Sequence, residues 1–186
     1  MPLVTLAEAV VYRGHHRTYA PIHFNRTAGR FASPDGVSFG TLYVGEDAYA
    51  AFIEAFGQGL VSSPLGVFAS EAWLATRCLC VISATRPLRL VDLSSGSALK
   101  RLSAQADGRL ADGAHHVSQQ WAAALWAHPE QPDGLLYRAR NAPDHRSMAL
   151  FDRVEDVLAA PCSGNLLDDE AQLARILDRF NCALIP

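Results

Sequence analysis

Three side chains that together could support chemistry on a charged ligand lie close to one another in the chain: Arg30, Tyr43 and Glu54. A guanidinium group binds phosphate oxygens through two parallel hydrogen bonds. A tyrosine ring stacks on flat rings and favours a cation over its face, and a carboxylate stabilises positive charge that develops during a reaction. The set predicts a site for a ligand with phosphates, a flat ring and a developing positive charge. Each residue alone is also compatible with an ordinary solvated surface position.

The elements expected to position these side chains are a short strand and a helix. Gly40 and Gly45 bound an alternating stretch that turns Tyr43 to one face. Asp47 is a suitable N-cap for the helix that follows, and Gly57 suits the left-handed position after its end. The buried stripe of this helix is predicted from its spacing to consist of Tyr49, Phe52, Ile53 and Phe56.

Glu54 falls outside that apolar stripe. It shares a side of the helix with Ala50 and Ala51, whose small side chains leave room for a ligand to approach the carboxylate. The turn from strand to helix is expected to bring Tyr43 and Glu54 to one cleft. Arg30 belongs to an arginine-rich polar loop that precedes the strand.

The composition is that of an ordinary globular protein of one domain, with 186 residues, 49% hydrophobic and 19% charged. A net charge of -3 argues against general nucleic-acid binding, which needs a basic face. The four cysteines include no C-x-x-C pair, so we expect buried free thiols rather than disulfides or a zinc site. The N-terminus has no signal-peptide pattern and no apolar run reaches membrane-spanning length. We infer a cytoplasmic protein that contacts neither membrane nor nucleic acid.

Short strands alternate with helices without a regular βαβ rhythm, which predicts an α+β fold in a single domain over residues 1–186. Residues 77–83 and 88–93 read as two strands of a hairpin. Residues 57–66 and 141–146 read as irregular connections. The adjacent pairs His15-His16 and His115-His116 lack the i, i+4 spacing of helical metal ligands, so we expect solvated or capping histidines and no metal site.

The chain resembles the RES domain family over roughly residues 10–152. Short motifs carry the resemblance, in this order: Tyr12-Arg13, Gly29-Arg30-Phe31, Leu42-Tyr43-Val44-Gly45, Ala51-Phe52-Ile53-Glu54, Pro87-Leu88-Arg89-Leu90-Val91-Asp92-Leu93, Asp133-Gly134-Leu135-Leu136-Tyr137-Arg138-Ala139-Arg140 and Ala149-Leu150-Phe151-Asp152. The resemblance implies a toxin of a bacterial toxin–antitoxin module, paired in an oligomer with an Xre-type antitoxin. It also implies a fold similar to ADP-ribosyltransferase toxins and NAD+ as the substrate, without a metal.

The family is named for an arginine, a glutamate and a serine, which by position correspond to Arg13 or Arg30, Glu54 and residue 139. The resemblance assigns the cationic ribose to Glu54, the nicotinamide ring to Tyr43, and the pyrophosphate to Arg30 and Arg13 with help from Arg140. Position 139 departs from the pattern, because it holds Ala139 where the family usually has serine. Either this branch works without the hydroxyl, or the chain is an attenuated variant in which Ala139→Ser raises activity.

Three functions remain open from the sequence. The first is breakdown of NAD+ by hydrolysis or phosphorolysis of the nicotinamide–ribose bond. The second is transfer of a single ADP-ribose to a cellular protein. The third belongs to another class: a binding module that keeps the fold, NAD and antitoxin contacts but has lost the chemistry. The sequence identifies neither the acceptor nor a protein target.

Overall fold

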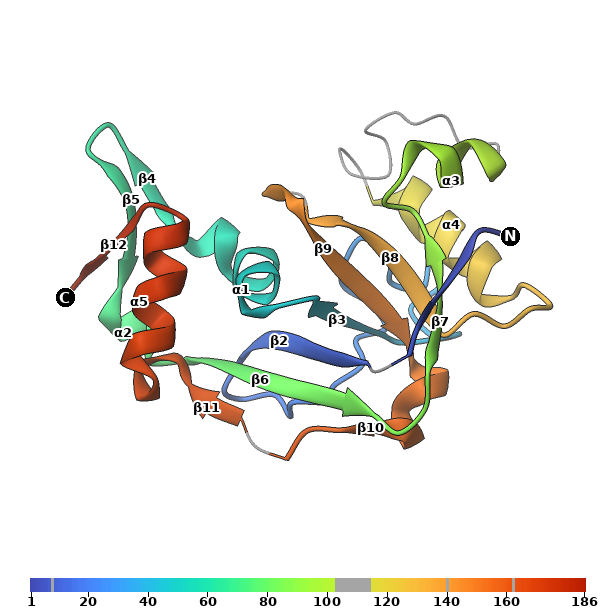
Figure 1. Cartoon of the computed structure of the whole chain (residues 1–186), viewed down its shortest axis with the longest axis horizontal. Coiled ribbons are helices and arrows are strands. Elements are labelled where there is room, and N and C mark those ends of the chain that lie inside the picture. The colour runs from blue at the N-terminus through green and yellow to red at the C-terminus, as the bar shows by residue number, and fades with distance from the viewer. Residues whose placement is uncertain (8, 103–114, 140, 162) are drawn as a thin grey trace.

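One large mixed sheet forms the middle of the molecule (Figure 1). The computed structural model describes residues 1–7, 9–102, 115–139, 141–161 and 163–186. Within them the order of hydrogen-bonded strands is β1-β7-β8-β9-β3-β2-β6-β10, and β11 also pairs with β6. The strands are β1 (Leu3–Leu6), β2 (Val10–His16), β3 (Thr41–Gly45), β6 (Arg77–Ala84), β7 (Leu88–Asp92), β8 (Gly134–Ala139), β9 (Ala142–Phe151), β10 (Leu158–Ala159) and β11 (Ser163–Asn165).

A second sheet of three strands, in the order β12-β5-β4, lies at the left-hand end in Figure 1. Its strands are β4 (Val61–Ser63), β5 (Gly66–Ser70) and β12 (Cys182–Ile185). The helices are α1 (Ala48–Phe56), α2 (Glu71–Leu74), α3 (Gly96–Arg101), α4 (His116–Trp126) and α5 (Glu170–Arg179), with short 3-10 turns at Gly57–Gly59, Asp152–Val157 and Leu166–Asp168. The predicted α+β class is confirmed. The likeness to the ADP-ribosyltransferase fold stays a prediction.

The strands β8 and β9 are apolar on both faces because both faces of the large sheet are covered. Leu136, Met148 and Leu150 pack into the core on one side. On the other side Leu135 and Ala149 pack against α4, through residues such as Ala122 and Leu125. Alternation along a strand places neighbouring residues on opposite faces, so these runs read as continuously hydrophobic.

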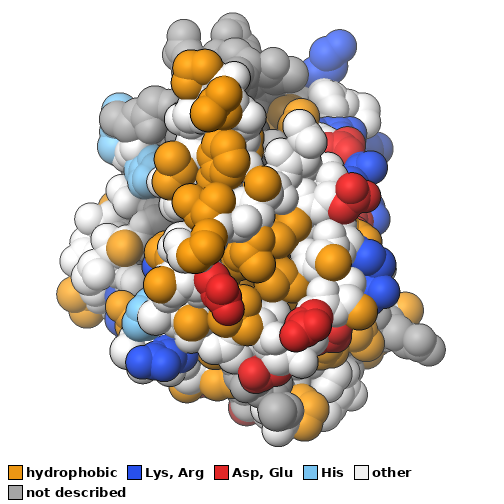
Figure 2. Space-filling model, turned by 90° about the vertical axis from the view of Figure 1, so that its left-hand side faces the viewer, with side chains coloured by type: hydrophobic (Ala, Val, Ile, Leu, Met, Phe, Trp, Pro, Cys, Tyr) orange, Lys and Arg blue, Asp and Glu red, His pale blue; other side chains and the backbone are white. Residues whose placement is uncertain are grey.

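Apolar side chains also gather on the surface of the end that carries the small sheet. Figure 2 shows them as a band along this face, bordered on one side by acidic side chains. The most exposed large ones here are Val61, Leu65, Leu184 and Ile185. This end of the molecule therefore presents hydrophobic surface, of the kind that marks contact regions in other proteins.

In the described part of the chain, none of the helices combines the length and the apolar character needed to cross a membrane.

Several sequence expectations about local structure are wrong. The strands β6 and β7 do not form a hairpin: β7 pairs with β1 and, in parallel, with β8, whereas β6 pairs with β2. Residues 57–66 contain β4, which pairs with β5, and residues 142–146 belong to β9. Gly57 has a right-handed φ of -56°, because the chain continues from α1 into a 3-10 turn rather than ending in a left-handed cap.

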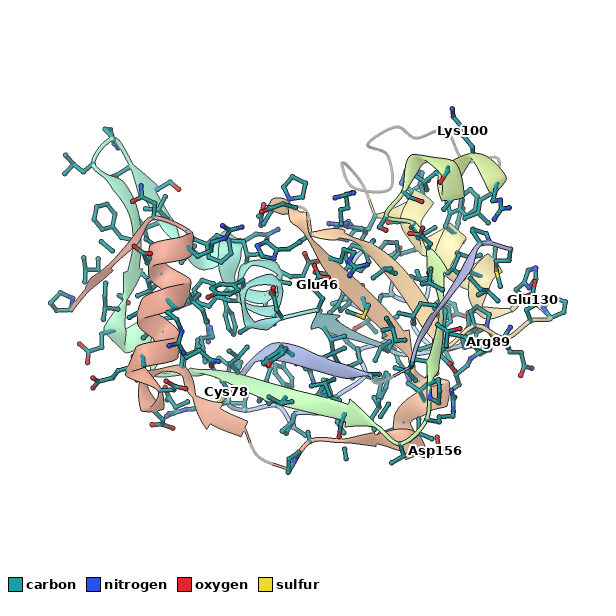
Figure 3. The ribbon with its side chains drawn as sticks, viewed as in Figure 1. Glu46, Cys78, Arg89, Lys100, Glu130 and Asp156 are labelled. Carbon is teal, nitrogen blue, oxygen red and sulfur yellow. The ribbon has the colours of Figure 1, made fainter. Side chains whose placement is uncertain are left out.

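The expected hairpin does not form because Asp133, just before β8, bonds the segment between β6 and β7 and the start of β7. Its buried carboxylate accepts two hydrogen bonds from the Arg86 guanidinium, both 2.8 Å, and one from the Arg89 N–H, at 2.7 Å. Arg89 in turn lies 3.7 Å from Glu130 (Figure 3). Burial alone would raise the pKa of Asp133, but these hydrogen bonds outweigh it and hold that pKa below its usual value.

We expect Asp133→Asn to destabilise the fold, because the amide keeps only one acceptor oxygen and presents its own N–H groups to Arg86. The expected loss is roughly 2–3 kcal/mol in the free energy of unfolding, since Arg86 is partly exposed. A carboxyl whose folded pKa is lowered stabilises above about pH 4 and loses that contribution as pH falls. Urea unfolding should therefore show a larger difference from wild type at pH 7 than at pH 3. The exposed Asp178→Asn is the control, and equal stability of Asp133→Asn at pH 7 would contradict the assignment.

The large sheet opens between β2 and β3. In the described residues these strands share one facing pair, Tyr12 and Gly45. If this pairing continued, Gly14 would lie beside Tyr43. Two residues before Tyr43 on β3, however, Thr41 exchanges both backbone hydrogen bonds with Asn25, at 2.8 and 2.9 Å. The segment leading to Asn25 thus takes the place of β2 along this edge, and a gap is left in the sheet.

Candidate functional site

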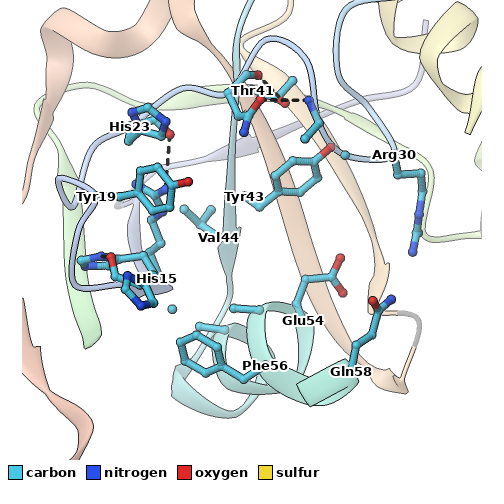
Figure 4. Close-up of a pocket in the computed structure, with 18 of the residues that line it drawn as sticks. His15, Tyr19, His23, Arg30, Thr41, Tyr43, Val44, Glu54, Phe56 and Gln58 are labelled. Atoms are coloured by element: carbon cyan, nitrogen blue, oxygen red, sulfur yellow. Dashed lines mark hydrogen bonds between the residues drawn. The ribbon is translucent and has the colours of Figure 1, made fainter. Parts of the chain in front are cut away.

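The gap between β2 and β3 is the mouth of a pocket of about 530 Å³ (Figure 4). Ligand pockets in proteins measure ~300–1,000 Å³, so this one is large enough for a nucleotide-sized molecule. Its walls come from β2, β3, α1 and the loop that carries residues 25–30. Arg13, Arg30, Tyr43 and Glu54 all line it. The structure therefore brings together four of the residues singled out from the sequence.

Glu54 is carried into the pocket by α1. The Asp47 side chain caps the helix by accepting a 2.7 Å hydrogen bond from the Ala50 N–H, as predicted. The helix approaches β3 closely because Gly45 has no side chain: a Cβ there would lie 2.3 Å from the Ala51 nitrogen. Ala51 borders the pocket beside Glu54.

The Glu54 carboxylate is held by Tyr137 on β8. The Tyr137 hydroxyl donates a 3.0 Å hydrogen bond to Glu54 Oε1. The Tyr137 ring is buried, and burial followed by the nearby Glu54 charge raises its pKa well above the usual value, so the phenol stays protonated and keeps donating. One carboxylate oxygen is thus fixed, and Oε2 is the oxygen that a ligand can engage.

Tyr43 is fixed through its hydroxyl, which accepts a 2.8 Å hydrogen bond from the Phe31 N–H. Burial raises the pKa of Tyr43 to about 12, so the ring is neutral at physiological pH. The loop passes close to the phenol at Gly29, which has a φ of +117°. Strand alternation also turns the backbone N–H and C=O of Tyr43 to the same edge as those of Thr41, so both face the gap.

Arg30 lies over two aromatic rings at the rim of the pocket. Its guanidinium carbon is 5.4 Å from the centre of the Tyr137 ring and 5.7 Å from that of Phe31. Cation–π contacts of this kind orient a guanidinium while leaving its N–H edges for other partners. Figure 4 shows Arg30 and Glu54 on one side of the pocket, with Tyr43 next to them near its middle.

Arg13 has a different environment from the one expected of a phosphate ligand. Its guanidinium donates to the carbonyl oxygens of Ala20, at 3.2 Å, Pro21, and His23, at 3.3 Å. Burial lowers its pKa to about 10, which leaves it charged at neutral pH. In this structure Arg13 therefore organises the loop of residues 20–23, and its contact with pyrophosphate stays a prediction.

The pocket is strongly biased towards positive charge. The described residues that line it include three arginines, Arg13, Arg30 and Arg77, and four histidines. Glu54 is the one carboxylate among them, in a chain whose net charge is -3. Such a lining favours an anionic ligand, and Glu54 is the one point where it can stabilise positive charge on that ligand. Among the described residues, no group of three or more His, Cys, Asp or Glu side chains is arranged to hold a metal ion.

Ala139 lies outside the pocket lining. It is buried beside Ile53 and Ala142 in a small apolar cluster, two residues after Tyr137 on β8. Arg140, the assisting phosphate ligand of the sequence interpretation, falls outside the described residues. The expectation that His15 is solvated is wrong, since it is buried and lines the pocket, where burial lowers its pKa.

Comparison with known proteins decides the family. A model of the RES domain matches residues 7–174, which is most of the chain. The chain belongs to the RES domain family. This RES domain is also 36% identical over 124 residues to a protein of Sinorhizobium fredii (strain NBRC 101917 / NGR234) named "Probable toxin y4kH". The aligned region is 67% of this chain and 92% of that protein.

Tyr137 is the site residue that the sequence interpretation of this RES domain missed. It belongs to the motif at residues 133–140, two positions before Ala139. Residues two apart on a strand share a face, so a signal existed: the tyrosine and position 139 both point towards α1. In this structure Tyr137 gives Glu54 a hydrogen bond from the same strand, although position 139 has no hydroxyl.

For the NAD+ breakdown that the resemblance implies, we expect Tyr137→Phe to lower kcat for nicotinamide release about 10- to 100-fold, because a hydrogen bond to a carboxylate is lost. The ring beneath Arg30 is kept, so KM for NAD+ should change less than threefold. Steady-state kinetics on the folded variant separate the two parameters. The matched control is Tyr49→Phe, which removes a tyrosine hydroxyl from α1 rather than from β8. A kcat within twofold of wild type would show that Tyr137 does not position Glu54.

The structure leads us to expect little effect of Ala139→Ser on turnover, less than about threefold. Tyr137 already donates to Glu54, and the new hydroxyl would enter the apolar cluster around Ile53. Burying a hydroxyl without a partner costs roughly 1–3 kcal/mol of stability, which thermal unfolding would detect. A tenfold rise in nicotinamide release would instead support the attenuated-variant interpretation.

Proposed function

We propose that this RES domain is a toxin enzyme that breaks the nicotinamide–ribose bond of NAD+. The observation that carries the proposal is one electropositive pocket in which Glu54, Tyr43 and Arg30 meet. A dinucleotide supplies two phosphates for the arginines and a flat cationic ring for the tyrosine. It also has a sugar that becomes cationic as the bond breaks, which suits the single carboxylate.

In this mechanism Glu54 accepts hydrogen bonds from ribose hydroxyls through Oε2 while Tyr137 holds Oε1. Those hydrogen bonds strengthen as the ribose gains positive charge, which lowers the barrier rather than merely tightening binding. Tyr43 stacks on the nicotinamide ring. Arg30 donates to the pyrophosphate and keeps the dinucleotide in register with Glu54.

The bond that breaks joins ribose C1′ to the nicotinamide nitrogen, and its electron pair neutralises the pyridinium ring. A nucleophile then forms a new bond at C1′. Water gives ADP-ribose and a proton, whereas phosphate gives the 1-phosphate of ADP-ribose. A side chain of a target protein would give the ADP-ribosylated protein.

Toxicity fits this chemistry because NAD+ is needed throughout metabolism, and the relative in Sinorhizobium fredii carries the name of a probable toxin. We propose an Xre-type antitoxin as the partner. An acidic segment of that partner would complement the arginine- and histidine-rich pocket and exclude the dinucleotide. The complex would then be inactive until the antitoxin is removed.

The test is to incubate the purified protein with NAD+ and to separate the products by chromatography, in buffer, with added phosphate, and with cell extract. Nicotinamide release in buffer supports hydrolysis, release that requires phosphate supports phosphorolysis, and a protein-bound ADP-ribose mass in extract supports transfer. Intact NAD+ that nonetheless binds would identify a binding module. Intact NAD+ that does not bind would refute the proposal.

A further inference from the structure

A second group of side chains borders the same pocket and has no part in the mechanism above. Figure 4 shows Tyr19 and His23 on the side opposite Glu54 and Arg30, with Tyr43 and Val44 between the two groups. The Tyr19 and His23 rings are stacked, with centroids 4.9 Å apart and an interplanar angle of 26°. Tyr19 is 51% exposed, so a face of this aromatic pair is open to a ligand.

The aromatic pair is held in place rather than carried on a loose loop. The Arg13 guanidinium donates to the carbonyl oxygens of three residues between Ala20 and His23, as the dashed line at His23 in Figure 4 illustrates. At the start of the segment the Tyr19 N–H donates to the His16 carbonyl, at 3.0 Å. Asn25, at its end, is bonded to Thr41 of β3. Holding the rings in advance reduces the entropy lost when a ligand stacks on them.

We propose that the Tyr19–His23 pair binds the adenine end of the dinucleotide, an assignment that rests on the proposed function. A dinucleotide has a flat base at each end and two phosphates in the middle. The pocket has Glu54 and Arg30 on one side, the Tyr19–His23 pair on the other, and Tyr43 between them. The base stacks on the open face of Tyr19, and this stacking raises affinity for NAD+ without contributing to the bond-breaking step.

The structure favours a base over an acidic peptide as the occupant of this end. An acidic peptide would be recognised by charge, which Arg30 provides on the opposite side of the pocket. A stacked aromatic pair with an exposed face is instead the feature that nucleic-acid-binding proteins use to hold bases, with little preference for one base over another.

The experiment compares NAD+ with nicotinamide mononucleotide, which has the nicotinamide and ribose but lacks the adenylate. Nicotinamide release from both substrates is measured for wild type, Tyr19→Ala, Tyr19→Phe and Leu65→Ala. Leu65 is 89% exposed on the turn between β4 and β5 and does not line the pocket, so its truncation controls for loss of an exposed side chain. The preference is the ratio of kcat/KM for NAD+ to kcat/KM for the mononucleotide.

We expect Tyr19→Ala to lower that preference about tenfold, within the range measured for loss of one base stack, through KM for NAD+. Its rate on the mononucleotide should stay within twofold of wild type. Tyr19→Phe keeps the ring and should keep the preference, as should Leu65→Ala. An unchanged preference in Tyr19→Ala overturns the assignment while leaving the proposed function in place.

A separate measurement decides the assignment even if wild type releases no nicotinamide, an outcome that would refute the proposed function. Calorimetric titration with ADP-ribose reports binding without any reaction. Binding that weakens about tenfold in Tyr19→Ala and not in Leu65→Ala supports the adenine end. Absence of ADP-ribose binding to wild type, or equal binding to Tyr19→Ala, overturns it.

Discussion

Replacing Glu54 with glutamine is expected to lower nicotinamide release from NAD+ by at least about 10²–10³-fold, with the protein still folded. The amide has the shape of the carboxylate and can still accept the hydrogen bond from Tyr137. It lacks the negative charge that offsets the charge on the ribose, so the loss falls on the transition state. The effect should therefore appear in kcat, with KM for NAD+ changed little.

Initial rates over a range of NAD+ concentrations, together with a thermal unfolding curve, test this expectation. Glu71→Gln, an exposed glutamate at the start of α2, controls for the loss of one negative charge. Turnover of Glu54→Gln close to wild type would show that the reaction does not depend on this carboxylate and would remove the basis of the proposed mechanism.

The second large effect is expected from Gly29→Ala, in the loop above Tyr43. A Cβ at this position would lie 2.5 Å from the Tyr43 hydroxyl oxygen and 2.9 Å from the ring, too close for either to stay in place. The φ of +117° adds backbone strain of its own. The substitution must displace Tyr43 or the segment carrying Arg30, and we expect kcat/KM for NAD+ to fall about 100-fold, as for other small misplacements of reacting groups.

Gly66→Ala separates strain from displacement of the site. Gly66 has a similar backbone conformation, with φ +136°, but an added Cβ there meets ring atoms of Phe68 at ordinary distances, 3.8 Å or more. We expect this control to lose roughly 1–2 kcal/mol of stability and to keep its activity. If Gly29→Ala retained activity while losing the same stability, the close fit of this loop against Tyr43 would not matter for the reaction.

Local features of the site were predictable from the sequence because short-range physics determines them. Asp47 caps the helix through an N–H three residues away, and the apolar spacing correctly places Phe52, Ile53 and Phe56 in the core, although Tyr49 of the same stripe is only half-buried. The side of α1 that carries Glu54 follows from the same spacing. Alternation along β3 likewise predicts which face of the strand carries Tyr43.

The features that were missed depend on partners far away in the chain. The hydrogen bond from Tyr137 to Glu54 joins residues 83 positions apart. The hairpin expectation failed because Asp133, remote from both strands in sequence, bonds Arg86 and the start of β7. The resemblance implies a pyrophosphate contact for Arg13, which stays a prediction, but it does not show that backbone carbonyls of residues 20–23 surround the guanidinium.

The break in the large sheet has a mechanical consequence. A continuous ladder of hydrogen bonds would make the separation of β2 and β3 rigid. In this structure one facing pair joins the two strands, and α1 contacts both of them. That helix touches β2 at Gly14, where a Cβ would lie 2.8 Å from Ala55 and from the Phe56 ring, and β3 at Gly45. The thickness of α1 therefore determines how far apart the walls stand. Enlarging the side chain at Gly45 would alter the width of the opening without changing any residue that lines the pocket.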